Sequence, residues 1–349
     1  MPPKRGLKPS KAGASKKQKA TRAEASKGAS AVAVDIEECS FTAQEVSQVR
    51  LALLDWYDTN HRILPWRRNP HSKLGSAAVA AAAAKGRSGA PEDMPQNQFI
   101  YWVWVCEVSR AAEYFIKWTK RWPTVEGLAQ ATQEEVNEMW AGLGYYRRAR
   151  FLLEGAKYVM EQLGGQFPRT SKELQKIPGV GAYTGNAIAS IACSERCAVV
   201  DGNVVRVLAR LRRVGADPRS GAAVKLFGEL AAALVHPDRP GDFNQAMMEL
   251  GATVCVPNTQ PQCAACPVSA CCSAFKAVQQ HQAAGGAPAA AKAPSVLDYP
   301  AKVEKAERRE VTVAVAVVQL VAPGSDAAAV ADAKFLLVQR PKDGLLAGK

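Results

Sequence analysis

Five cysteines crowd into residues 255–272, and their spacing constrains the chain more than any other feature. A short loop that brings four soft sulfur ligands together selects an iron–sulfur cluster or a zinc ion, because hard cations prefer oxygen ligands. Zinc is the weaker alternative, since zinc sites more often combine two short C-x2-C hooks and this loop has one. The candidate ligands are Cys255, Cys263, Cys266, and Cys271 or Cys272.

The composition predicts a globular protein with more than one domain. At 349 residues, of which 48% are hydrophobic, the chain can form two or three domains with buried cores. We expect no membrane association, because no apolar run approaches the roughly 20 residues of a membrane span. Nine cysteines fit a reducing compartment better than a disulfide framework. Those outside the loop are expected to be ordinary buried thiols, and they are Cys39, Cys106, Cys193 and Cys197.

Much of the net charge of +13 lies in the N-terminal tail. Residues 1–30 hold nine Lys and Arg against one acidic residue, Glu24. We therefore expect residues 1–38 to be a disordered basic tail, which raises non-specific affinity for nucleic acid without specifying a fold. The run Lys16-Lys17-Gln18-Lys19 favours the nucleus, and the acid-poor, Ser/Ala-rich start leaves an organelle as the alternative.

Helical periodicity dominates residues 39–254, which we expect to form a mainly α core. Residues 70–98 interrupt it with an Ala/Gly/Ser/Pro-rich stretch, predicted to be a flexible insertion rather than an element. After the loop at 255–275, we expect a linker over 276–300. The predicted helices cover 41–58, 99–117, 124–140, 146–163, 171–176, 182–193, 203–213, 222–235 and 243–252.

Residues 301–349 contain two strand-like runs, Val311 to Leu320 and Phe335 to Gln339. Two isolated strands cannot close a sheet. We therefore expect the beginning of a β domain that this sequence does not complete.

Ile177-Pro178-Gly179-Val180-Gly181 predicts a tight turn inside a helix-hairpin-helix over residues 174–193. Its glycines allow the backbone to approach a ligand, and the amides at the next helix N-terminus form a phosphate site. Such contacts grip DNA without reading its sequence. Taken alone, the Gly-x-Gly pattern favours an ordinary turn between helices, and the motifs around it reverse that preference.

Two carboxyls are candidates for acid–base chemistry. Asp201 stands where a helix begins, so the helix N-terminus favours its ionised form. Glu107 follows the apolar run Trp102 to Cys106, and burial there favours its protonated form. One ionised and one protonated carboxyl is the pairing that cleavage of a glycosidic bond requires. The structural alternatives are a helix cap for Asp201 and a satisfied core carboxyl for Glu107.

Six motifs in order resemble the adenine DNA glycosylases of the MutY type, and they cover most of residues 41–275. The resemblance implies a monomeric base-flipping enzyme of base excision repair, with a helix-hairpin-helix fold and a [4Fe-4S] cluster. It would remove adenine mispaired with 8-oxoguanine or guanine in double-stranded DNA. The motifs are Leu64-Pro65-Trp66-Arg67, Trp140 to Tyr146, Pro178 to Tyr183, Val200 to Asn203, Asp242 to Gln245 and the cysteine loop.

The resemblance also implies roles for single residues. Glu107 would protonate adenine N7 as the general acid, and Asp201 would stabilise the oxocarbenium ion or a transient adduct. Tyr183 and Asn203 would support that centre. Tyr145 would be a wedge beside the oxidised guanine, with an aromatic core residue as the alternative. The remaining contacts would be Trp66 and Arg67 near the adenine, the hairpin residues Pro178, Gly179, Val180 and Gly181 on DNA, and the cluster ligands Cys255, Cys263, Cys266 and Cys272.

Tyr183 and the cysteine spacing separate this chain from close alternatives. The related endonuclease III type carries a Lys in the hairpin, whose amine forms a Schiff base during strand cleavage. A tyrosine cannot do this, so we expect a monofunctional glycosylase. In the loop, Cys272 rather than Cys271 restores the five-residue gap of the family, although the first gap is seven residues instead of six.

Two departures from the family pattern support a different alternative. After Glu107-Val108 the chain lacks about seven residues that the family uses to insert a glutamine into the DNA stack. The run from Tyr299 resembles the entry to a MutT-like (Nudix) domain, of which only the first part is present. The alternative is therefore a catalytically impaired isoform that still binds DNA.

Overall fold

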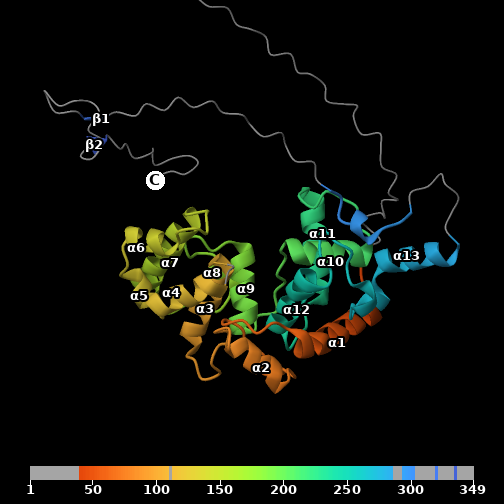
Figure 1. Ribbon diagram of the computed structural model, residues 1–349, viewed down its shortest axis with the longest axis horizontal. Coiled ribbons are helices and arrows are strands. Elements are labelled where there is room, and N and C mark those ends of the chain that lie inside the picture. The colour runs from red at the N-terminus through yellow and green to blue at the C-terminus, as the bar shows by residue number, and fades with distance from the viewer. Residues whose placement is uncertain (1–38, 110–111, 286–292, 303–318, 321–333, 336–349) are drawn as a thin grey trace, which may run out of the picture. The chain divides into compact units, whose positions relative to one another are not determined.

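The computed structural model describes residues 39–109, 112–285, 293–302, 319–320 and 334–335. The first part of the chain forms nine helices, shown from red to green in Figure 1. They are α1 (Ala43–Asn60), α2 (Ser76–Ala83), α3 (Gln96–Ser109), α4 (Ala112–Arg121), α5 (Val125–Ala129), α6 (Gln133–Met139), α7 (Arg147–Leu163), α8 (Ser171–Leu174) and α9 (Ala182–Cys193).

The second part contains four further α-helices, three short 3-10 helices and two strands. The strands pair antiparallel, with Gln319 opposite Phe335. Within the described residues, no helix is both long and apolar enough to cross a membrane. The elements are α10 (Gly202–Arg212), α11 (Gly221–Leu234), α12 (Pro240–Thr253), η2 (Cys263–Ala265), η3 (Ser269–Cys271), α13 (Ser273–Ala283), η4 (Val296–Asp298), β1 (Gln319–Leu320) and β2 (Lys334–Phe335).

Side-chain caps mark where several of these helices begin. Thr42 accepts a hydrogen bond from the Glu45 amide, and the Glu45 carboxylate accepts one from the Thr42 amide, which forms a capping box. Thr132 and Glu135 form a second capping box at the start of α6. This cap explains why the single helix predicted over 124–140 is instead the pair α5 and α6.

The helices build two hydrophobic clusters. The first is formed by α3 to α9 and buries Trp104, Trp118 and Trp140. The second is formed mainly by α1, α10, α11 and α12, together with the cysteine loop. Helix α9 contacts α3 of the first cluster and α12 of the second, and α12 also contacts α10 and α1 (Figure 1). The chain passes from the first cluster to the second between α9 and α10.

The structure differs from the sequence-based expectation in three further segments. Residues 70–98 contain helix α2, in which no residue is buried, so the high helix propensity of alanine suffices without an apolar face. The predicted helix over 99–117 is α3 and α4, with residues 110–111 outside the described part. The predicted linker is partly ordered, because α13 extends to Ala283.

The C-terminal expectation is only partly covered by the described residues. Of the predicted strands, Gln319–Leu320 belongs to β1 and Phe335 to β2. The remainder, residues 311–318 and 336–339, lies outside the described part of the chain, as does the tail at 1–38. The MutT-like assignment of 301–349 therefore stays a prediction.

Candidate functional site

A cavity of about 220 Å³ gathers side chains from both hydrophobic clusters. Its walls come from α3, α9, the start of α10, α12 and the segment after α1. Cavities for drug-sized ligands measure ~300–1,000 Å³, so this volume suits a smaller ligand. Six of the residues predicted from the sequence line it, namely Trp66, Arg67, Glu107, Tyr183, Asp201 and Asn203.

Asp201 is the N-cap of α10, as the sequence predicts. Its Oδ1 accepts hydrogen bonds from the amides of Asn203 and Val204, both at 2.8 Å. Its Oδ2 accepts one from Asn203 Nδ2, also at 2.8 Å. These bonds fix the carboxylate at the positive end of a helix while it faces the cavity. Asn203 therefore holds Asp201 directly.

Glu107 lies near the end of α3, after a buried apolar run. Its side chain is half-buried rather than enclosed, and Cys106 Sγ donates to its Oε1 at 3.9 Å. A second cavity lies beside the first, and both Glu107 and Tyr183 line the two cavities. The two predicted carboxyls thus face one cavity from different helices.

Sequence reasoning missed a buried ion pair in the cavity wall. Glu249 on α12 is fully buried, and it binds both Arg62 at 2.6 Å and Arg67 at 2.7 Å. Burial alone would raise the pKa of Glu249, but hydrogen bonds from Arg62 and the charge of Arg67 outweigh it and lower the pKa to about 2. Gln245, in one of the sequence motifs, also lines the cavity, and Glu249 follows it by four residues on the same helix. This spacing, which places two side chains on one helix face, was the available sequence signal.

Trp66 lines the cavity from the segment that follows α1. Its ring packs edge-on against Phe115, with ring centres 5.0 Å apart. Phe115 is fully buried and contacts Trp102 in the same manner at 5.3 Å. These edge-on ring contacts hold Trp66 in place in the cavity wall.

The hairpin residues divide between three positions. Pro178 and Gly179 line the second cavity together with Arg148. Gly179 has φ +81°, and a Cβ there would lie 2.5 Å from Phe151 Cβ, so only glycine fits. Val180 is a buried core residue. Gly181 is the N-cap of α9 and makes no side-chain cap, as it has no side chain.

Tyr145 stands apart from the cavity. Its side chain is 77% exposed and its backbone has φ +48°, which is uncommon for a residue other than glycine. The guanidinium carbon of Arg148 lies 4.9 Å from the centre of the ring. The exposure contradicts the alternative that Tyr145 is an aromatic core residue.

The cysteine loop forms a third cavity, and its lining separates the two candidates for the last position. Cys271 is buried outside this lining, where its Sγ donates to Gln48 Oε1 at 3.4 Å. Among the described residues, no group of three or more His, Cys, Asp or Glu is arranged to hold a metal ion as it stands. The cysteines that line the cavity are Cys255, Cys263, Cys266 and Cys272.

The thiols of the loop are close enough to affect one another. Burial first, and then the neighbouring cysteines, raise the pKa of Cys266 to about 12 and that of Cys272 to about 11. Burial also raises the pKa of Cys263, with Cys255 adding to the effect. Burial therefore favours the thiol over the thiolate at Cys263, Cys266 and Cys272.

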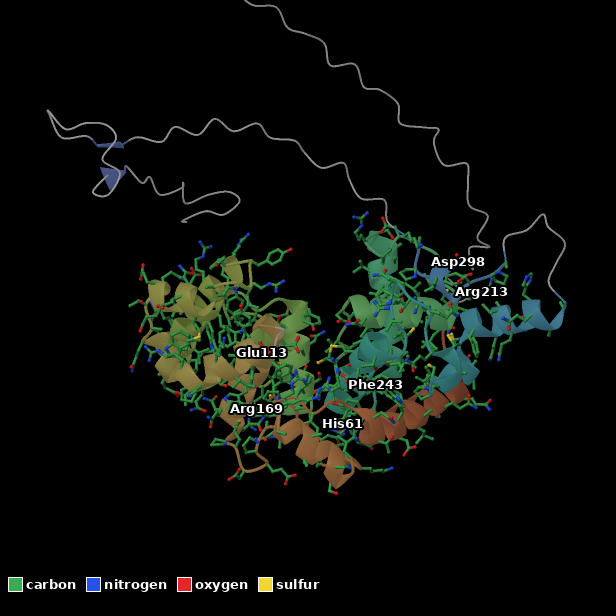
Figure 2. All side chains as sticks on the ribbon, in the orientation of Figure 1. His61, Glu113, Arg169, Arg213, Phe243 and Asp298 are labelled. Carbon is green, nitrogen blue, oxygen red and sulfur yellow. The ribbon has the colours of Figure 1, made fainter. Side chains whose placement is uncertain are left out.

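Helix α10 joins the cavity to the cysteine loop. Arg206 Nη2 donates to Asn203 Oδ1 at 2.8 Å, and Arg206 Nε donates to the Cys255 carbonyl at 2.8 Å. Arg210 is 3% exposed and donates to Cys255 Sγ at 3.1 Å. Both arginines thus reach the cysteine loop. Arg213, labelled in Figure 2 near Asp298, closes α10 beside η4 by donating to the Tyr299 hydroxyl at 3.2 Å.

Comparison with known proteins connects this site to DNA repair. A model of the HhH-GPD superfamily of base excision DNA repair proteins matches residues 106–232. The solved structure of a thermostable thymine-DNA glycosylase aligns with a TM-score of 0.53 and 25% identity, covering 67% of this chain and 97% of that chain. These two matches confirm the predicted mainly helical, helix-hairpin-helix glycosylase fold.

Two curated relatives are more similar in sequence. Adenine DNA glycosylase of Arabidopsis thaliana is 42% identical over 340 residues, which cover 90% of this chain and 48% of the relative. Adenine DNA glycosylase of Schizosaccharomyces pombe is 34% identical over 339 residues, which cover 88% of this chain and 69% of the relative. The chain thus spans about half the length of the plant relative.

Proposed function

Because the chain belongs to the adenine DNA glycosylase family, we propose that it hydrolyses the N-glycosidic bond of adenine mispaired with 8-oxoguanine or guanine in double-stranded DNA. The observation that carries this proposal is the single cavity lined by both predicted carboxyls, Glu107 and Asp201. Its volume of about 220 Å³ suits one flipped base rather than a base pair.

In the proposed reaction the two carboxyls act in sequence. Glu107 gives its proton to N7 of the flipped adenine, and the bond between the sugar C1′ and adenine N9 breaks, with its electron pair leaving on the base. The sugar becomes an oxocarbenium ion, which the Asp201 carboxylate stabilises. A water molecule then adds to C1′ and loses a proton to the Glu107 carboxylate. The products are free adenine and an abasic site.

The hydrogen bonds around Asp201 support this role. Three donors already occupy its two oxygens, so the carboxylate cannot rotate freely and is held facing the cavity. Asn203 supplies two of these donors, one from its amide and one from its side chain. Tyr183 lines the same cavity as the two carboxyls and would orient the substrate.

Tyr183 also supports a monofunctional enzyme over a glycosylase with lyase activity. Among the residues that line the cavity there is no lysine, so its described wall offers no side-chain amine for a Schiff base. Incubation with a mispaired duplex and borohydride should therefore trap no covalent adduct. A trapped adduct would favour the lyase alternative.

We propose that DNA binds across the hairpin and Tyr145. The amides at the start of α9 would contact a phosphate, and Pro178 to Gly181 would bring the backbone close to it. Tyr145, which is exposed and held by an unusual backbone conformation, would insert beside the base opposite the adenine.

We also propose that the cysteine loop holds a [4Fe-4S] cluster. A donor set of four thiolates is the one that such clusters use, and all four predicted ligands line the same cavity. When bound, such a cluster contributes folding free energy to the loop.

A catalytically impaired, DNA-binding isoform is the second candidate. The departure from the family pattern after Val108, where about seven residues of that pattern are absent, supports it, because this point lies close to Glu107 at the end of α3. The nuclear location expected from Lys16 to Lys19 and the monomeric state stay predictions.

The test is adenine release from duplexes that carry adenine opposite 8-oxoguanine, guanine or thymine, with strand breaks revealed by alkali. The proposal expects release from the first two duplexes and little from the third. Tight binding of all three duplexes without release, by protein that contains iron, would favour the impaired isoform.

A further inference from the structure

Glu249 uses one carboxylate to hold two arginines in the wall of the cavity. Its Oε1 accepts a hydrogen bond from Arg62 Nε at 2.6 Å. Its Oε2 accepts one from Arg62 Nη2 at 2.9 Å and one from Arg67 Nη2 at 2.7 Å. The side chain of Glu249 is fully buried, so these contacts replace its hydration. One negative charge therefore serves two positive charges.

Arg67 depends on this carboxylate more than Arg62 does. The side chain of Arg62 is 52% exposed and can be solvated, whereas that of Arg67 is 9% exposed. Arg67 Nη1 donates to the Arg62 carbonyl at 3.0 Å, and its Nε is buried without a hydrogen-bond partner among the described residues. Removing the carboxylate would leave a buried guanidinium without its counter-charge, which is strongly unfavourable.

The position of this cluster matters for the reaction. Arg62, Arg67 and Glu249 line the same cavity as Asp201. A positive charge is proposed to develop on the sugar there, and two unbalanced guanidinium groups nearby would oppose it. Glu249 thus reduces an unfavourable field and fixes the direction of Arg67.

We propose that Glu249 is a positioning residue, which acts through Arg67 to shape the cavity for the flipped adenine. This inference rests on the proposed glycosylase function. A purely structural role would be served equally well by apolar side chains, since buried ion pairs are often replaceable by them without loss of stability. Three charges in a cavity wall depart from the usual apolar packing of buried side chains, and such departures are common at functional sites.

The test is a double-mutant cycle in single-turnover adenine release. Glu249→Gln keeps the shape of the side chain and removes its charge, and we expect the rate to fall about 100-fold, the scale of a misplaced positioning group. In an Arg67→Met background the same substitution should cost almost nothing, because the group it positions is absent. Glu229→Gln, on the exposed face of α11 beside Lys225, is the matched control and should keep the wild-type rate.

A second readout does not need catalysis. Wild type should bind a duplex with an uncleavable 2′-fluoro adenine nucleotide more tightly than one with an abasic analogue. Glu249→Gln should lose this binding preference. If the wild type releases no adenine, the proposed function fails, while this preference still decides the role of Glu249. An equal loss of preference or rate in both Arg67 backgrounds would overturn the inference.

Should Glu249→Gln not fold, Glu249→Asp provides the decision. It keeps the charge but is one methylene shorter, so it cannot reach both arginines at hydrogen-bond distance. We expect a partial loss of rate in the wild-type background and none in the Arg67→Met background. A Glu249→Asp enzyme with the wild-type rate and preference would overturn the inference.

Discussion

Replacing Gly179 by alanine should destabilise the protein through the hairpin turn. The new Cβ would lie 2.5 Å from Phe151 Cβ and 3.1 Å from its Cγ, and the residue would keep φ +81°. The backbone conformation costs an L-residue about 1–2 kcal/mol, and overpacking costs about 1–3 kcal/mol. The lower entropy of the unfolded alanine chain offsets about 0.4–1 kcal/mol. We expect a net loss of about 1–4.5 kcal/mol in the free energy of unfolding.

Urea unfolding followed by circular dichroism measures this loss, as a lower midpoint with an unchanged slope. Gly228→Ala is the matched control, because a Cβ at this position in α11 meets nothing within 4 Å. It should stabilise the helix by about 0.5–1 kcal/mol. A change of less than about 0.5 kcal/mol for Gly179→Ala, the range of a neutral surface substitution, would refute this account of the turn.

Further predictions concern acid, metal and DNA. The pKa of Glu249 is about 2 in the folded protein, against a usual 4.5. The ionised side chain therefore stabilises the folded protein fully above pH 4.5, and this stabilisation is lost as the pH falls toward about 2. In urea unfolding, the advantage of wild type over Glu249→Gln should therefore shrink by about 3 kcal/mol across that window, and parallel curves would contradict it. Cys272→Ser should lose iron and visible absorbance, whereas Cys271→Ser should keep both; equal iron in the two variants would refute the ligand choice. Tyr145→Ala should weaken DNA binding by about 1–3 kcal/mol at unchanged folding stability, and a drop in stability instead would show that the ring packs internally.

Elements with local signals at their ends were predictable from the sequence. Helix α9 follows the Gly-x-Gly turn and matches its predicted range, 182–193, because the boundary is set by residues next to it in the chain. The break between α5 and α6 was missed, although the capping box of Thr132 and Glu135 was present in the sequence. There the continuous periodicity hid the cap.

The site was predictable only where motifs mark it. Asp201 and Glu107 stand in recognisable local contexts, and they do face one cavity. Glu249 could not be found in the same way, because its partners Arg62 and Arg67 lie 187 and 182 residues away along the chain. A charged residue in a helix is usually solvated, and only the packing of α12 against the segment after α1 makes this one a buried ion pair.

Adenine release in a single turnover, from a duplex with adenine opposite 8-oxoguanine, is the measurement that tests the central claim. It compares wild type with Glu107→Gln and Asp201→Asn, and Asp55→Asn at an exposed ion pair is the matched control. The account predicts release by wild type and the control, and none by the two cavity variants, with all four proteins binding the duplex. Release by Asp201→Asn at the wild-type rate would contradict it.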